Sequence, residues 1–215
     1  MKLPRGIQLD DPRPIAASAP YTYSLPNPDE LQALGPGDAI KAIFRETNGG
    51  KEYDAERMWV RIDKIQGQTV IGRVDNIPFD MPSIQLHDLV EIPLTHAIDV
   101  DYAEGKPHPV VPERRWYWDR CLVDACILSG RSPVDYLYRE EPDTMQPDDT
   151  YPDSGWRIRG TDAGIVEDER LGEEPEYIAL GKVLNQDDRW LHLIDSEVGC
   201  AFQWDSEHND FVEAD

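Results

Sequence analysis

The stretch MWVRIDKIQGQTVIGRV, residues 58–74, decides how the first half of the chain folds. Apolar side chains nearly alternate with polar ones on both sides of Gln66-Gly67-Gln68, which has the composition of a tight turn. This pattern predicts a β-hairpin. Residues 39–44 and 86–92 have strand-forming compositions bounded by turn residues, so the region predicts a small barrel or curled sheet of four or five strands.

The second half of the chain predicts a mixture of helices and strands. Pro112 and Glu113 fit the first turn of a helix that would end at Gly130, with an apolar face made of Trp118, Leu122, Ala125 and Ser129. Strands are expected at residues 134–139, through Trp156 and Ile158, and at 200–204, with a short helix at 190–194 and acidic loops between them. We therefore expect an α+β fold, in which a small β-barrel-like or curled-sheet N-terminal unit precedes an α+β unit with a mixed or antiparallel sheet.

The composition divides the chain into four segments. Residues 1–34 hold six prolines and no sustained apolar period, which predicts an extended lead-in. Residues 35–102 form the predicted small β-rich domain, residues 103–112 a linker, and residues 113–215 the α+β domain. A chain of 215 residues is long enough to bury a core in each domain.

The chain is strongly acidic, with a formal net charge of -22. The excess is uneven, because residues 106–215 hold 11 basic and 26 acidic side chains. Such a surface repels phosphate backbones and anionic lipid headgroups, so we expect no binding to nucleic acid or to membranes. It favours a basic protein as partner. The alternative is that the charge only keeps the chain in solution.

The sequence leads us to expect no cofactor, no metal and no secretion signal. Three cysteines occur without a C-x-x-C pair, five histidines occur without H-x-x-x-H spacing, and the acidic runs do not match a calcium-binding loop. Charges and prolines stand where a signal peptide would be apolar, and no stretch has the length and hydrophobicity of a membrane span. These features predict a soluble, cytoplasmic protein, and they leave its oligomeric state open.

The serine, carboxylate and arginine-aromatic patterns of the chain do not single out a catalytic site. Ser154 lies in Asp-Ser-Gly-Trp, which fits a turn better than the strained G-x-S-x-G turn of a nucleophile. Carboxylate pairs are too frequent in this chain for one pair to mark a general acid and base. Residues 114–118 mix arginine with aromatic residues, and on the predicted helix we interpret them as core packing with charge at the rim. We therefore expect a non-catalytic binding protein.

Carboxylates gather in two segments of the second half, which we expect to meet at one edge and to form a patch for a basic protein partner. The alternative is two separate, solvated loops. The predicted partner-binding residues are Glu140, Glu141, Asp143, Asp148 and Asp149 in the first segment, and Asp162, Glu167, Asp168, Glu169, Glu173 and Glu174, with Glu176 close by, in the second.

Two parts of the chain resemble bacterial protein families. The runs Tyr136-Leu-Tyr-Arg-Glu-Glu-Pro-Asp143 and Asp153-Ser-Gly-Trp-Arg157, followed by Leu184-Asn185, make residues 115–212 similar to bacterial immunity protein family 33, also described as domain of unknown function 2185. Residues 35–100, with Glu56-Arg-Met-Trp-Val60 and Asp88-Leu-Val90, look like domain of unknown function 2314.

The first resemblance implies an immunity protein, which binds and neutralises a co-encoded toxin and needs no catalytic residues. It also implies a structural motif made of Arg139, Asp153, Gly155 and Trp156, with the choice of toxin left to variable loops. The alternative is a small-ligand-binding module or an uncharacterised housekeeping enzyme. A deep pocket at Arg139, Glu140 and Trp156 that holds a carboxylate with a strongly shifted pKa would favour that alternative.

Overall fold

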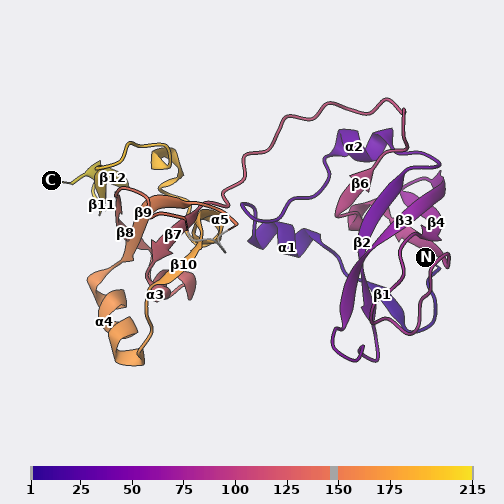
Figure 1. The fold of residues 1–215 in the computed structure, drawn as a ribbon, viewed down its shortest axis with the longest axis horizontal. Coiled ribbons are helices and arrows are strands. Elements are labelled where there is room, and N and C mark those ends of the chain that lie inside the picture. Colours follow the sequence, from indigo (N-terminus) through magenta and orange to yellow (C-terminus); the bar gives the residue numbers. More distant parts are fainter. Residues whose placement is uncertain (1, 146–149, 215) are drawn as a thin grey trace. The chain divides into compact units, whose positions relative to one another are not determined.

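The computed structural model describes residues 2–145 and 150–214. The chain forms two compact units (Figure 1). Each unit has its own hydrophobic core. The first unit comprises Met1–Ser18 and Tyr23–Glu113, and the second comprises Ala19–Thr22 and Arg114–Asp215. Within the described ranges, no helix is long and apolar enough to cross a membrane.

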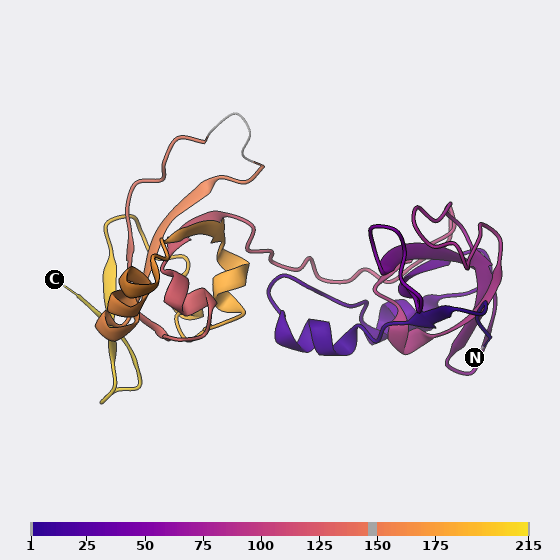
Figure 2. The ribbon, with the colours of Figure 1, turned by 90° about the horizontal axis from the view of Figure 1, so that it is seen from below.

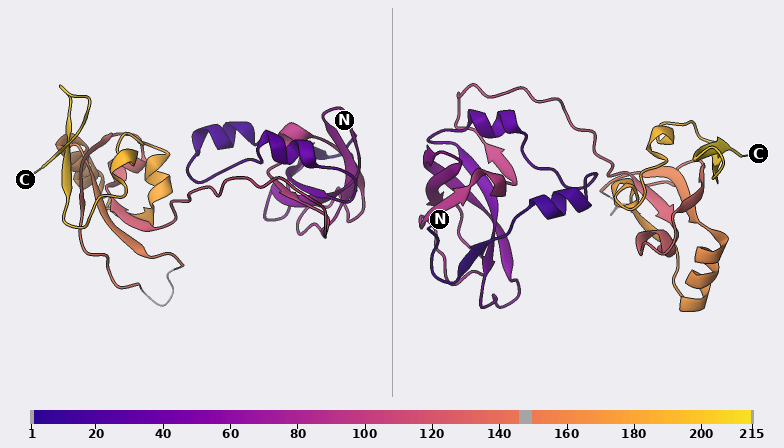
Figure 3. Two further views of the ribbon diagram at one scale, coloured as in Figure 1. Left: turned by 90° about the horizontal axis from the view of Figure 1, so that it is seen from above. Right: turned by 180° about the vertical axis from the view of Figure 1, so that it is seen from behind.

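The first unit is a curled antiparallel sheet of six strands (Figure 3). The strands are β1 (Ile7–Leu9), β2 (Ala39–Glu46), β3 (Ala55–Gln66), β4 (Thr69–Val74), β5 (Leu89–Pro93) and β6 (Asp99–Asp101). Their order is β1-β2-β3-β4-β5, and β6 also pairs with β2. The predicted hairpin is confirmed, because Gln66 pairs with Thr69 at the turn between β3 and β4. A bulge between Ile62 and Lys64 increases the local twist and helps the sheet to curl around its core.

The N-terminal residues add three elements that the sequence did not reveal. Residues 1–34, expected to be an extended lead-in, contain β1, helix α1 (Arg13–Ser18) and helix α2 (Pro28–Ala33). Three paired residues are too few to show strand periodicity, but Ile7 is buried where β1 pairs with β2. The side chain of Asn27 accepts a hydrogen bond from the Glu30 N–H at 2.9 Å, and this capping box starts α2. A short 3-10 helix, Leu94–His96, follows β5.

The second unit is built on a mixed sheet with the order β10-β7-β9-β8-β11-β12. The strands are β7 (Arg120–Val123), β8 (Val134–Arg139), β9 (Asp153–Gly160), β10 (Glu176–Ala179), β11 (Ala201–Asp205) and β12 (Asp210–Glu213). Strands β7 and β9 run parallel, whereas the other neighbouring pairs are antiparallel. The predicted α+β class with a mixed sheet is therefore confirmed, and the strands expected at residues 134–139, 156–158 and 200–204 are β8, β9 and β11.

Two buried tryptophans mark the core of the second unit. Trp156 on β9 and Trp190 pack edge to face, with ring centroids 5.7 Å apart. The helices of this unit are short: α3 (Ala125–Leu128), α4 (Asp162–Leu171), α5 (Leu180–Leu184) and a 3-10 turn at Leu191–Leu193. The 3-10 turn lies where a short helix was expected at residues 190–194.

The helix predicted from residue 113 to residue 129 is wrong. Arg120–Val123 form β7, and only Ala125–Leu128 are helical. Cys121 and Val123 are buried whereas Leu122 is exposed, so this segment has the period of a strand, which the helical spacing of its other apolar residues obscured. Trp116 is 41% exposed and stacks on Trp118 at 5.5 Å, so the interpretation of residues 114–118 as core packing is wrong for Trp116.

The acidic loop predicted after β9 is partly helical. Thr161 begins helix α4 by accepting a hydrogen bond from the Gly164 N–H at 3.2 Å, and Gly172 ends it in the left-handed conformation with φ 70°. The residues that α4 buries are Gly164 and Asp168. Because neither side chain is apolar, hydrophobic periodicity contains no signal of this helix.

Residues 19–22 belong to the second unit although they lie between two parts of the first. The Tyr21 N–H donates to Asn185 Oδ1 at 2.9 Å, and the Tyr21 hydroxyl donates to Asp188 Oδ2 at 2.7 Å. Asn185 Nδ2 donates to Thr22 Oγ1 at 2.8 Å, and the rings of Tyr21 and Tyr117 meet edge to face. The chain therefore passes between the two units three times.

Candidate functional site

The two acidic segments lie at opposite ends of β9. The first precedes Asp153, where β9 begins, and the second starts with α4, directly after β9 ends at Gly160. Figure 2 shows the beginning of β9 and helix α4 on opposite sides of the second unit. A strand rises about 3.3 Å per residue, so the two ends of β9 lie roughly 23 Å apart. Glu140 of the first segment nevertheless reaches Arg157 in the middle of β9, so the expectation that the two segments meet at one edge stays a prediction. Asp148 and Asp149 lie outside the described residues.

Two carboxylates of the first segment are held by a buried arginine. The side chain of Arg157 is 6% exposed, and it contacts Glu140 at 2.5 Å, Asp153 at 2.8 Å and Asp143 at 3.5 Å. Glu140 and Asp143 therefore share one cation of the protein with Asp153, although the side chains of Glu140 and Asp143 remain 48% and 84% exposed. Glu141 is exposed.

The motif residues of the immunity resemblance hold the start of β9 in place. Gly155 has φ 80°, and a Cβ atom there would lie 2.2 Å from the Glu140 carbonyl oxygen, so a side chain has no room. Arg139 donates from Nε to the Ser154 carbonyl at 3.0 Å and from Nη1 to the Ser196 carbonyl at 2.6 Å. Trp156 Nε1 donates to the Ile194 carbonyl at 3.2 Å. These contacts join separate loops and are structural.

The buried carboxylate of Asp153 predicts a loss of stability in acid. Burial raises the pKa of Asp153, but hydrogen bonds from Arg157 and from the Asp143 and Gly155 N–H groups outweigh burial and hold the pKa below its usual range. The stability that this carboxylate contributes is present above the unfolded-state pKa of about 4 and is lost as pH falls through the folded-state pKa. We expect the melting temperature, followed by near-ultraviolet circular dichroism, to fall below about pH 4.

The Asp153→Asn variant tests that assignment. It is expected to melt at a lower temperature at pH 7 and to lose less stability on acidification, because one depressed carboxyl is gone. Glu207→Gln, which removes an exposed carboxylate from the turn between β11 and β12, serves as control and is expected to keep the wild-type profile. Equal acid sensitivity in Asp153→Asn and in the wild type would contradict the assignment.

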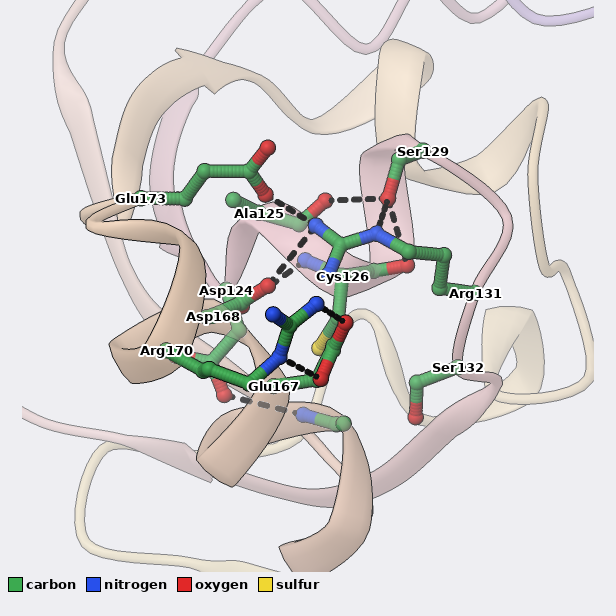
Figure 4. Close-up of polar contacts among 12 residues, drawn as sticks. Asp124, Ala125, Cys126, Ser129, Arg131, Ser132, Glu167, Asp168, Arg170 and Glu173 are labelled. Atoms are coloured by element: carbon green, nitrogen blue, oxygen red, sulfur yellow. Dashed lines mark hydrogen bonds and ion pairs between the residues drawn. The ribbon is translucent and has the colours of Figure 1, made fainter.

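Three carboxylates of the second segment also have partners within the protein. Asp168 is 6% exposed, accepts a hydrogen bond from the Cys126 N–H at 2.9 Å and pairs with Arg131 at 2.8 Å (Figure 4). Burial raises the pKa of Asp168, but these hydrogen bonds outweigh burial and lower it. Arg131 also pairs with Glu173, and Glu167 pairs with Arg170 at 2.5 Å on the surface of α4.

The remaining acidic side chains of this segment are available to a partner. Asp162, Glu169, Glu174 and Glu176 are exposed, and within the described ranges none of them forms an ion pair. Asp162 lies in the first turn of α4, where a negative charge stabilises the helix dipole. Glu174 and Glu176 lie together between α4 and β10.

A cavity of about 410 Å³ brings Glu173, Glu174 and Glu176 against α3. Its other walls are Ala125, Leu128 and Ser129. An apolar wall beside several carboxylates suits the side chain of lysine or arginine, whose alkyl stem packs on apolar atoms while its charged group meets the oxygens. We call this group of six residues the acidic cavity. The sequence predicted its glutamates and the helical state of residues 125–128. It did not predict that they meet, or that Arg131 pairs with Glu173, because both depend on tertiary packing.

A second cavity lies beside the structural motif. It measures about 200 Å³ and is lined in part by Arg139, Trp156 and Asp195, whereas Glu140 does not line it. A side-chain hydrogen bond from Arg115 lowers the pKa of Asp195. A lowered pKa keeps the carboxylate ionised, which suits an ion pair better than a general acid. The shift of the Asp195 pKa has an ion pair as its cause, and the alternative of a small-ligand-binding module or an enzyme stays a prediction.

The thiol of Cys126 lies beside the carboxylate of Asp168 in the second unit. Burial and a hydrogen bond with Asp168 raise the pKa of the Cys126 thiol to about 11, so it stays protonated and unreactive at neutral pH. The part of the chain that the structure describes contains no group of three or more His, Cys, Asp or Glu side chains placed to hold a metal ion.

Two protein families match the chain, one in each of its two units. Residues 121–215 match the immunity protein Imm33 domain. The Imm33 region thus includes β7 to β12, the acidic cavity and the structural motif. Residues 35–108 match a family described as an uncharacterized protein conserved in bacteria, DUF2314. Both resemblances are confirmed. The chain matched no curated protein and no solved structure. The Imm33 match suggests an immunity protein and implies a protein partner, such as a toxin.

Proposed function

We propose that this chain is an immunity protein that binds a basic protein toxin and neutralises it by covering the surface through which it acts. The Imm33 match supports the immunity role. The observation that carries the basic character of the toxin is the acidic cavity, where Glu174 and Glu176 lack ion pairs among the described residues and face the apolar wall of α3. We propose that a lysine or arginine side chain of the toxin enters this cavity.

The overall charge supports the same partner. The net charge of -22 accelerates encounter with a basic protein over a Debye length of about 8–10 Å at ordinary salt concentrations. The proposed action is stoichiometric binding without chemistry. We propose that it takes place in the cytoplasm, where the three free thiols, Cys121, Cys126 and Cys200, stay reduced.

Removing the two unpaired charges of the acidic cavity is expected to slow toxin binding. In the Glu174→Gln/Glu176→Gln double variant, the association rate constant for the purified toxin encoded by the adjacent gene should fall roughly tenfold at low ionic strength. The difference should disappear near 1 M salt, where the Debye length is about 3 Å. Surface plasmon resonance over a series of salt concentrations measures both effects.

A charge-matched control separates the cavity from the net charge. Glu197→Gln/Glu207→Gln removes two exposed carboxylates that do not line the acidic cavity. It is expected to bind the toxin at nearly the wild-type rate. Equal slowing in both double variants would reduce the effect to net charge, and no binding of the toxin to the wild-type chain would refute the proposed function.

A further inference from the structure

Two loops of the first unit display large apolar side chains to solvent. Ile77 is 77% exposed and Phe79 is 78% exposed, and Tyr53, 57% exposed, lies with its ring centroid 6.3 Å from that of Phe79. Ile77 and Phe79 line a cavity of about 510 Å³, together with Met81, Ile84 and Leu86. We call residues 48–54 and 76–86 the apolar platform. A contiguous exposed apolar group of this kind is typical of a protein-binding surface.

Carboxylate oxygens fix the backbone of the apolar platform by accepting hydrogen bonds from its N–H groups. Asp80, which is buried, accepts hydrogen bonds from the N–H groups of Lys51, Glu52 and Tyr53 at 2.9, 2.6 and 3.0 Å. These bonds tie the two loops to each other. Asp80 is also held in turn, because its own N–H donates to Glu56.

Further contacts fix the second loop along its length. Asn76 Oδ1 accepts a hydrogen bond from the Trp59 N–H at 2.8 Å, and Glu56 accepts one from the Phe79 N–H at 3.0 Å. Glu46 accepts hydrogen bonds from both the N–H and the hydroxyl of Ser83, at 3.1 and 2.7 Å. Ile77 and Phe79 are thus presented on a fixed backbone, so a partner that binds them orders few additional groups.

The charges around the apolar platform favour a basic partner. Its two loops contain the exposed carboxylates of Glu52 and Asp54 and one ammonium group, that of Lys51, whereas the carboxylate of Asp80 is buried. A second copy of this chain carries the same net charge of -22 and is repelled. A protein with an apolar pocket flanked by lysine or arginine has the complementary character.

We infer that the apolar platform is a second contact for the basic toxin, and that Ile77 and Phe79 insert into an apolar pocket on its surface. This inference rests on the proposed function and extends it to the unit that matches DUF2314. The acidic cavity accelerates encounter, whereas the apolar platform slows dissociation, because buried apolar anchors at an interface act mainly on the dissociation rate.

The Ile77→Ser/Phe79→Ser variant tests the inference in the full-length chain. Its affinity for the purified toxin encoded by the adjacent gene, measured by isothermal titration calorimetry, is expected to fall roughly 10- to 100-fold, mostly through faster dissociation. The salt dependence of association should stay that of the wild type. Both side chains are mostly exposed, so the melting temperature is expected to be unchanged.

The control removes equally exposed apolar groups elsewhere. Val110 is 98% exposed and Val166 is 63% exposed, and neither lines the cavity of the apolar platform, so Val110→Ser/Val166→Ser should bind as the wild type does. Wild-type affinity in Ile77→Ser/Phe79→Ser, together with slower binding in Glu174→Gln/Glu176→Gln, would overturn this inference and leave the proposed function intact. The inference would also be overturned if the wild-type chain formed a dimer that Ile77→Ser/Phe79→Ser converts to monomer, since a second copy of the chain would then cover the apolar platform. Failure of the wild-type chain to bind the toxin refutes both.

Discussion

Replacing Arg157 by alanine is expected to destabilise the second unit by about 3–5 kcal/mol, because it leaves a buried carboxylate without its cation. The side chain of Asp153 is 1% exposed, and Arg157 meets it through two hydrogen bonds, at 3.0 and 2.8 Å. The same substitution releases Glu140 and Asp143, which Arg157 holds at the beginning of the first acidic segment. Urea unfolding followed by near-ultraviolet circular dichroism measures the loss.

Two further variants separate this ion pair from other effects. Arg170 is 66% exposed and pairs with Glu167 on the surface, so Arg170→Ala is expected to change the free energy of unfolding by less than about 1 kcal/mol. Arg157→Met/Asp153→Leu removes both buried charges and should recover part of the lost stability. If Arg157→Ala were no more destabilising than Arg170→Ala, the network around Arg157 would not stabilise the fold.

The second large effect is expected from Trp156→Ala, which should cost about 3–5 kcal/mol. Trp156 is fully buried on the central strand, packs edge to face on Trp190, and satisfies the Ile194 carbonyl. Alanine would leave a large cavity and one buried carbonyl without its donor. Thermal unfolding with tryptophan fluorescence, checked by circular dichroism, measures the change.

Trp116→Ala is the matched control for that substitution. The same atoms are removed, but Trp116 is partly exposed and stacks on Trp118, so the expected cost is below about 1.5 kcal/mol. Similar losses in the two variants would mean that the second core does not depend on the Trp156–Trp190 pair.

The parts of the fold that the sequence predicted are those with local signals. The hairpin of β3 and β4 combines near-alternation with a glycine turn, and β8 and β9 have strand compositions between turn residues. Strand β7 was missed because its pairing with β9 depends on residues more than 30 positions away, and its apolar residues also fit a helical period. Helix α4 was missed because it buries Gly164 and Asp168 in place of an apolar face.

The sequence predicted which acidic residues belong to the candidate site, but it did not predict how they are arranged around it. The sequence singled out Glu173, Glu174 and Glu176 as members of an acidic run, and they do line one cavity. Composition could not distinguish Glu174 and Glu176, which form no ion pair among the described residues, from Glu140, Asp168 and Glu173, which pair with Arg157 or Arg131. Which carboxylate faces an internal arginine is decided by tertiary packing, so it is seen only when the strands are placed.

Residues 19–22 have a consequence for how this protein can be divided. Tyr21 and Thr22 bind Asn185 and Asp188, although more than 160 positions separate them along the chain. A gene segment that starts at residue 114 therefore encodes a second unit without residues 19–22. A segment that stops at residue 113 encodes the first unit together with those four residues of the second. Because residues 19–22 of the second unit lie between two parts of the first in the sequence, neither unit is encoded by one continuous gene segment. Recombination that transfers the second unit to another protein would have to transfer residues 19–22 as well.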